Sequence, residues 1–113
     1  MWPHMSHVKT RGTPPAPVFA ALGSDTRLEL VSRLSDGKEY SITTLTDDLD
    51  LTRQAVTKHL QVLQHAGIVS RQRIGRESRF TIRPGSIAQA RDYLTRVSDQ
   101  WDKAIARLRS AAT

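Results

Sequence analysis

The sequence predicts a mainly α-helical fold with one small β-hairpin, in the element order α-α-α-α-β-β-α. Three observations predict it. Apolar residues recur at helical spacing in four segments of the first 66 residues. The period then changes to two on either side of Gly75-Arg76-Glu77, which is typical of a hairpin. A last segment with helical spacing follows Pro84. With 113 residues the chain fits one domain.

The N-terminal residues are the least regular part of the chain. Residues 1–17 contain four prolines and a glycine with little periodicity, so we expect a flexible arm there. A short helical segment is expected at residues 18–22, ending at Gly23. Ser24 is then expected to cap a second helix, with Asp25 in its first turn, where the helix dipole favours a negative charge.

The second helix is expected to end at Gly37, which readily adopts the left-handed conformation of a helix stop. Ser41 is the next candidate N-cap. It would open a short third helix whose apolar face consists of Ile42, Leu45 and Leu49.

A fourth helix is predicted at residues 53–66, after a tight connection through Leu51 and with Thr52 as its N-cap. Its apolar residues are Ala55, Val56, Leu60, Leu63 and Ala66. Its other face is polar and basic and consists of Arg53, Gln54, Thr57, Lys58, Gln61 and Gln64. Two helices joined by a few residues, the second polar on its outer face, form a helix-turn-helix.

The hairpin is predicted from strands at residues 68–74 and 78–83. In the second strand Phe80 and Ile82 alternate with polar residues, which indicates one buried face. A hairpin in this position is a wing, so the expected fold class is the winged helix-turn-helix. Ser86 is expected to open the last helix, whose apolar stripe is nearly heptad-spaced.

Charge is strongly segregated along the chain, whose net charge is +6. Residues 24–51 have a net charge of −4, whereas residues 53–83 hold seven basic residues and a single acid, Glu77. A surface selected for solubility mixes both signs. The imbalance therefore indicates a phosphate-binding surface on the fourth helix and the wing.

Several classes of function are excluded by what the sequence lacks. It contains no cysteine, hence no disulfide or thiolate site, and no phosphate-binding glycine motif, metal-ligand cluster or Ser-His-acid set. We therefore expect neither an enzyme nor a cofactor. Its apolar runs are far shorter than the roughly 20 residues that cross a bilayer, so we expect a cytoplasmic protein with no membrane partner.

Three segments resemble the ArsR/SmtB-type winged-helix repressors: Ala-Leu-Gly-Ser-Asp-Thr-Arg at 21–27, Leu-Thr-Arg-Gln-Ala-Val-Thr-Lys-His-Leu at 51–60, and Leu-Gln-His-Ala-Gly-Ile-Val at 63–69. The similarity runs through residues 18–83, expected to be the DNA-binding domain, with 84–113 as its dimerisation helix. The resemblance implies a homodimer that binds a palindromic operator in double-stranded DNA and represses transcription, often releasing DNA when an inducer binds. The sequence identifies no inducer.

The sequence departs from the metal-sensing members of this family. Their Cys-x-Cys motif aligns with Ser41-Ile42-Thr43, and no histidine follows His65, where a second site of the family has its ligands. Aspartates alone on a solvated helix make a poor transition-metal site. We therefore expect no metal site and a regulator that responds to another signal or to its own concentration.

The expected DNA contacts are Thr52, Arg53, Gln54, Thr57, Lys58, His59, Arg73, Arg76 and Arg79. Arg53 and Gln54 are candidates for base edges, because their side chains pair with guanine and adenine through two hydrogen bonds. Thr57 and Lys58 are candidates for phosphate, and the wing arginines, led by Arg76, for phosphate or the minor groove. The family pattern sets His59 beside the DNA backbone, and the alternative is a half-buried structural histidine.

The expected dimer interface is the apolar stripe of the last helix together with the first helix, namely Val18, Phe19, Leu22, Leu94, Val97, Trp101, Ile105 and Leu108. An apolar stripe alone does not distinguish packing on its own domain from packing on a partner. A second alternative concerns function. A winged helix can serve as a protein-interaction module without contacting DNA, because fold does not fix function.

Overall fold

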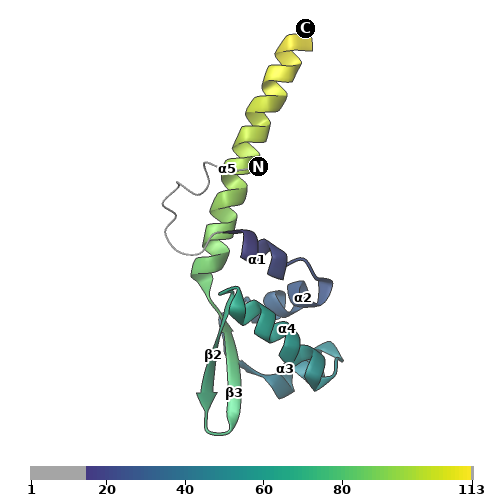
Figure 1. Cartoon of the computed structure of the whole chain (residues 1–113), viewed down its shortest axis with the longest axis vertical. Helices are drawn as coiled ribbons and strands as arrows, with labels where there is room; N and C mark the ends of the chain where they lie inside the picture. Colours follow the sequence, from purple (N-terminus) through teal and green to yellow (C-terminus); the bar gives the residue numbers. More distant parts are fainter. Residues whose placement is uncertain (1–14, 113) are drawn as a thin grey trace.

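The computed structural model describes residues 15–112 and confirms the mainly helical fold with a small hairpin (Figure 1). Its elements are α1 (Pro15–Ala21), α2 (Asp25–Leu34), β1 (Tyr40–Ser41), α3 (Ile42–Leu49), α4 (Arg53–His65), β2 (Val69–Ile74), β3 (Glu77–Ile82) and α5 (Pro84–Ala112). The sequence pattern did not predict β1, because two residues are too few to show a period.

The three strands form an antiparallel sheet in the order β1-β3-β2. Ile74 pairs with Glu77, so the hairpin turn consists of Gly75 and Arg76 alone and is one residue shorter than expected. Gly75 has φ +63°, whereas Arg76 has a negative φ. A positive φ at the first turn residue only is typical of a type II′ turn, whose twist matches that of the strands.

One apolar core joins the helices to the sheet. Its largest fully buried side chains are Leu30, Leu34, Leu45, Leu60, Leu63, Ile68, Val18, Val56 and Val69. The buried face of α4 is therefore the face predicted from its spacing, since Val56, Leu60 and Leu63 are all 0% exposed. Among the described residues no polar side chain is buried. The polar face of α4 is consequently left to solvent.

The three predicted N-caps of the helix-turn-helix region are present. The side chains of Ser24, Ser41 and Thr52 accept hydrogen bonds from backbone N–H groups three residues later. One helix ends earlier than expected: α2 ends at Leu34, whereas the sequence predicted that it would continue to Gly37. Asp50 ends α3 in the left-handed conformation with φ 53° and opens the turn to α4.

Two helices begin earlier than expected, each at a proline. Residues 15–17, assigned from the sequence to the arm, form the first turn of α1, and the rest of the expected arm lies outside the described residues. Likewise α5 begins at Pro84, so Ser86 is not its cap and instead donates a hydrogen bond to the carbonyl of Gly67. Proline suits a first turn because the N–H it lacks has no helical partner there.

Helix α5 gives the molecule its elongated outline, which measures 63 × 31 × 24 Å. Its 29 residues correspond to a helix of about 43 Å. Its first turns pack beside α1, where the rings of Phe19 and Tyr93 are 5.7 Å apart, and the rest extends away from the other elements (Figure 1). None of the helices in residues 15–112 combines the length and apolar character needed to span a membrane.

Candidate nucleic-acid interface

A shallow groove of about 500 Å³ follows the outer face of α4. It is lined by Arg53, Gln54, Thr57, Lys58 and Gln61. The structure thus brings together four residues of the predicted contact set. It adds Gln61, which was placed on the polar face but left out of that set. The sequence spacing could have identified Gln61 as a groove residue, because it lies one helical turn beyond Thr57.

Three polar side chains at the start of α4 have partners within the helix-turn-helix. The Arg53 guanidinium donates a hydrogen bond of 2.9 Å to the hydroxyl of Thr43 on α3. The hydroxyl of Thr57 donates to the Arg53 carbonyl, and that of Thr52 accepts from the Ala55 N–H. Arg53 is therefore held across the turn, whereas the side chains of Gln54 and Lys58 have no hydrogen-bond partner within residues 15–112.

His59 lies on the edge of α4 that faces α2 and is half-buried. Its Nδ1 atom is 3.2 Å from Nη1 of Arg27. The ring is therefore packed as the structural alternative expected, with one nitrogen bonded. The other nitrogen, Nε2, has no hydrogen-bond partner in the part of the chain that the structure describes.

The arginines of the wing differ in direction and in pairing. Arg73 pairs with Ser78, and Arg79 pairs with Gln72, so the two arginines lie on opposite faces of the pleated hairpin. Arg79 forms an ion pair of 2.6 Å with Glu77, and Arg73 donates to the carbonyl of Gly75 at 3.4 Å. Arg76 is exposed at the tip and has no partner in the described chain. Of the three predicted wing contacts it is the most available.

In the acidic half of the chain, two carboxylates, Asp48 and Asp36, have partners close to them. Arg33 on α2 forms an ion pair with Asp48 on α3, and Asp48 raises the pKa of the Arg33 guanidinium. The pKa of the Asp36 carboxyl is lowered, because the Tyr40 hydroxyl and then the Lys38 N–H donate to it. The hydrogen bond between the Tyr40 hydroxyl and the Asp36 carboxylate also raises the pKa of Tyr40. These charges stabilise the connections between α2, β1 and α3.

The apolar stripe of α5 begins inside the domain and continues beyond it. Ala90 is buried and Ile87 packs against the core, whereas Leu94, Trp101 and Leu108 are 54%, 64% and 69% exposed. Val97 is half-buried and Ile105 is exposed. Beyond its first turns the stripe therefore does not pack on its own domain.

A hollow of about 490 Å³ lies where the stripe leaves the domain. Phe19 and Leu22 line one side of it, and Ile87, Ala90 and Leu94 are among the residues that line the other. Val18 is only 1% exposed, in the core of its own chain, so its expected place in a dimer interface does not fit this structure. The remaining members of the predicted interface are accessible.

The residues that align with the metal ligands of the family do not fit a metal. The Ser41 hydroxyl caps α3 and donates to the hydroxyl of Thr44, and the Thr43 hydroxyl accepts from Arg53. Neutral hydroxyls already used in these hydrogen bonds lack the thiolate chemistry of that site. Nor do the described residues contain a cluster of three or more metal-ligating side chains.

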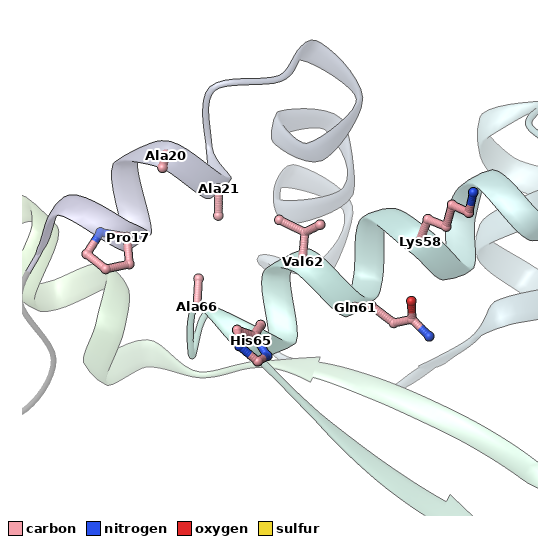
Figure 2. A pocket seen from close by; sticks show the side chains of 8 residues that line it. All are labelled: Pro17, Ala20, Ala21, Lys58, Gln61, Val62, His65 and Ala66. Carbon is pink, nitrogen blue, oxygen red and sulfur yellow. The ribbon is translucent and has the colours of Figure 1, made fainter.

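A second hollow, of about 720 Å³, lies between α1 and α4 (Figure 2). Pro17, Ala20, Ala21 and Ala66 surround one end, whereas Lys58 and Gln61 lie toward the other, where they also line the groove (Figure 2). Sequence reasoning missed this hollow, because its walls come from helices that are far apart in the sequence.

Comparison with known proteins identifies the family. A family model described as a helix-turn-helix domain matches residues 22–72. Over 65 residues the chain is 42% identical to YuzN of Bacillus subtilis (strain 168), an uncharacterised HTH-type transcriptional regulator, with 52% of this chain and 71% of YuzN covered. An ArsR-like transcriptional regulator from Rhodococcus sp. RHA1 has a similar structure, with TM-score 0.75, 34% identity and coverage of 88% of this chain and 92% of that one.

A more distant structure shares the fold. It is the homodimeric winged helix-turn-helix DNA-binding domain Mb0332 from Mycobacterium bovis, with TM-score 0.60, 24% identity and coverage of 75% of this chain and 78% of that one. The sequence identity to the Bacillus and Rhodococcus regulators is higher, and the similar regions cover most of those two proteins. The chain therefore belongs to the ArsR family of winged helix-turn-helix transcriptional regulators.

Proposed function

We propose that this protein is a homodimeric repressor, that each protomer inserts α4 into the major groove of a palindromic operator, and that the wing contacts the flanking backbone. The observation that carries the proposal is the concentration of seven basic residues and one acid in residues 53–83, on α4 and the hairpin. On the acidic side of the chain, Asp48 of α3 is paired with Arg33 of α2 and not with a basic residue of α4 or the wing.

The geometry of α4 supports contact with base edges. A helix of 13 residues is about 20 Å long and fits a major groove about 12 Å wide. Gln54 and Lys58 point from its outer face without a partner in the described chain, and Arg53 lies at its N-terminal end. Residues near the start of a recognition helix are those that reach bases. We assign Arg53 and Gln54 to bases, and Thr52, Thr57, Lys58, His59 and Gln61 to phosphates or the groove edge.

The wing is proposed to contact the DNA backbone rather than bases. Arg76 at the hairpin tip reaches phosphate or the minor groove, with Arg73 and Arg79 on opposite faces of the hairpin in supporting positions. Guanidinium groups in a minor groove respond to its width more than to base identity. The wing therefore contributes affinity more than sequence preference.

The proposed dimer pairs the α5 stripe with its symmetry mate, together with Phe19 and Leu22. Leu94, Trp101 and Leu108 are more than half exposed in the single chain, which favours a partner over packing on the same domain. One recognition helix reads only a few base pairs, so a two-fold pair with half-sites about one DNA turn apart supplies the needed specificity.

Binding to chromosomal DNA implies a cytoplasmic protein.

A salt titration tests the DNA-binding part of this proposal. Fragments selected by the protein from genomic DNA are labelled, and binding is followed by fluorescence anisotropy from low to high salt, with an unselected fragment of equal length as control. We expect tighter binding to selected fragments and a linear fall of log affinity with log salt, at a slope of about −0.9 per phosphate neutralised. Absence of binding to both fragments at low salt would contradict DNA binding and favour a protein-interaction module.

A further inference from the structure

The hollow between α1 and α4 has the size and lining of a small-molecule site. Its volume of about 720 Å³ falls within the roughly 300–1,000 Å³ that is usual for ligand pockets. Small apolar residues line most of it, a few polar side chains lie toward one end, and the lining contains no acid (Figure 2). A mostly apolar wall with few polar groups is the usual composition of a ligand site.

The apolar part of the hollow includes a side chain that the core of the protein leaves uncovered. Val62 on α4 is 41% exposed, whereas the next residue, Leu63, is fully buried. Val62 lies between the small residues at one end of the hollow and the polar residues at the other (Figure 2). Replacing water against Val62 and the neighbouring alanines by apolar atoms is favourable. The walls therefore favour a ligand with an apolar body.

The polar end of the hollow carries a positive charge. The Lys58 side chain is exposed and has no hydrogen-bond or ion-pair partner within residues 15–112. Gln61 also lines this end, and its amide both donates and accepts. A carboxylate carries the single negative charge that one ammonium group balances, whereas a phosphate group carries nearly two. The charge and the amide therefore favour a carboxylate as the polar group of the ligand.

The hollow and the DNA groove share two residues because they lie along neighbouring faces of α4. The four α4 residues of the hollow follow the i, i+3, i+4, i+7 spacing of one helix face, and they are Lys58, Gln61, Val62 and His65. Lys58 and Gln61 line the groove as well. A carboxylate in the hollow and a DNA phosphate in the groove would therefore compete for the same ammonium group.

We propose that the hollow binds an organic carboxylate with an apolar body, and that this ligand weakens DNA binding by taking Lys58 from its phosphate. The apolar body occupies the space between Val62 and the alanines of α1, and the carboxylate lies at Lys58 and Gln61. The ligand site stands on the hollow itself, whereas the effect on DNA rests on the proposed function. The ligand would then act on the recognition helix directly.

Direct binding to the free full-length protein tests the ligand site without DNA. The probes are 1-naphthylacetate and 1-naphthylacetamide, which share an apolar body and differ in charge. Calorimetry should show about tenfold tighter binding of the acetate, because its hydrogen bond from Lys58 is charge-assisted. In ¹H–¹⁵N spectra, the shifts caused by the acetate should be centred on Ala20, Val62 and Ala66. No binding of the acetate, equal affinities of the two probes, or shifts centred elsewhere would each overturn the proposal.

Two substitutions test the two ends of the hollow. Lys58→Met removes the charge but keeps a long side chain, so it should weaken binding of the acetate about tenfold and leave binding of the amide nearly unchanged. Ala20→Phe places a ring in the apolar space and should abolish binding of both probes. Ala20 is exposed, so this substitution leaves the core intact.

The matched control for Ala20→Phe is Ala106→Phe. Ala106 is exposed on α5, away from the hollow, so this variant should bind both probes normally. Unchanged binding of the acetate in Lys58→Met or in Ala20→Phe would overturn the proposal. A monomeric Ala20→Phe variant would also overturn it, because a second copy of the chain would then be the occupant of the hollow.

Competition for Lys58 has a signature in the salt titration. Saturating 1-naphthylacetate should lower DNA affinity about tenfold and reduce the magnitude of the salt slope by about one, because one phosphate contact is lost. DNA should weaken binding of the acetate by the same factor. The amide should leave the slope unchanged. Ala20→Phe keeps all proposed DNA contacts, so it should bind DNA normally and be insensitive to the acetate.

The ligand site and the proposed function fail in distinguishable ways. A protein that binds the acetate in the hollow but binds no DNA at low salt would contradict the proposed function and support the ligand site. DNA binding that is unaffected by saturating acetate would contradict the competition for Lys58, and with it this inference, while the proposed function would stand.

Discussion

Helices α4 and α5 are both amphipathic, and each leaves one face outside the core, but the uncovered faces differ in chemistry. The face of α4 carries Arg53, Gln54, Lys58 and Gln61, whereas that of α5 carries Leu94, Trp101 and Leu108. A polar and basic face is stable in water and attracts polyanions, whereas an exposed apolar stripe is stabilised by a second apolar surface. In the proposed function, the face of α4 binds DNA and the face of α5 binds a second copy of the chain.

The largest effect is expected from placing a charge in the apolar stripe. Trp101→Glu should convert the dimer to a monomer and lower operator affinity more than about 100-fold, because a monomer engages only one half-site. Sedimentation velocity and anisotropy measure the two effects. Gln100→Glu is the matched control, since it adds the same charge one residue away but off the stripe. A Trp101→Glu variant that remains dimeric would locate the interface elsewhere.

A smaller and sequence-dependent effect is expected from the N-terminal end of α4. Arg53→Ala and Gln54→Ala should each cost about 1–3 kcal/mol on the operator and much less on unselected DNA, because each removes a bidentate contact to a base. Both variants should remain dimeric, because the substitutions change DNA contacts of α4 and leave α5 unchanged. Equal losses on operator and unselected DNA would contradict base recognition by these residues.

The smallest effect is expected at the wing tip. Arg76→Ala should weaken binding to all DNA sequences by a similar, roughly tenfold factor and reduce the magnitude of the salt slope by about one. Its control is Lys103→Ala on α5, which removes the same charge far from the wing and should leave affinity unchanged. A change of sequence preference in Arg76→Ala would mean that the wing reads bases.

Most of the fold was predictable from local signals. The caps at Ser24, Ser41 and Thr52 and the apolar spacing of α4 act within a few residues, and each is present as expected. Helix starts at Pro15 and Pro84 were missed because proline was interpreted as a breaker, although it is also suited to a first turn. Strand β1 was missed because its two residues pair with residues of β3 that lie far away in the sequence, Tyr40 with Phe80 and Ser41 with Arg79.

The site was predictable in composition but not in pairing. Helical spacing alone indicated that Arg53, Gln54, Thr57 and Lys58 share a face, and they do share one groove. No local rule shows that Arg53 is held by Thr43, that Arg79 is paired with Glu77, or that Arg27 reaches His59. Long flexible side chains choose partners through tertiary structure, so the availability of each arginine required the structure.

The hydrogen bond from Ser86 to the Gly67 carbonyl joins the base of α5 to the turn that ends α4. The base of α5 is thereby tied to the end of α4, and α1 contacts both helices as well. Over the roughly 43 Å of α5, each degree of rotation at the base moves the far end by about 0.75 Å. If α4 follows the base of α5, a change in the angle between the two α5 helices of the proposed dimer changes the separation of its two α4 helices. The half-site spacing that the dimer prefers would then depend on the conformation of the dimer interface.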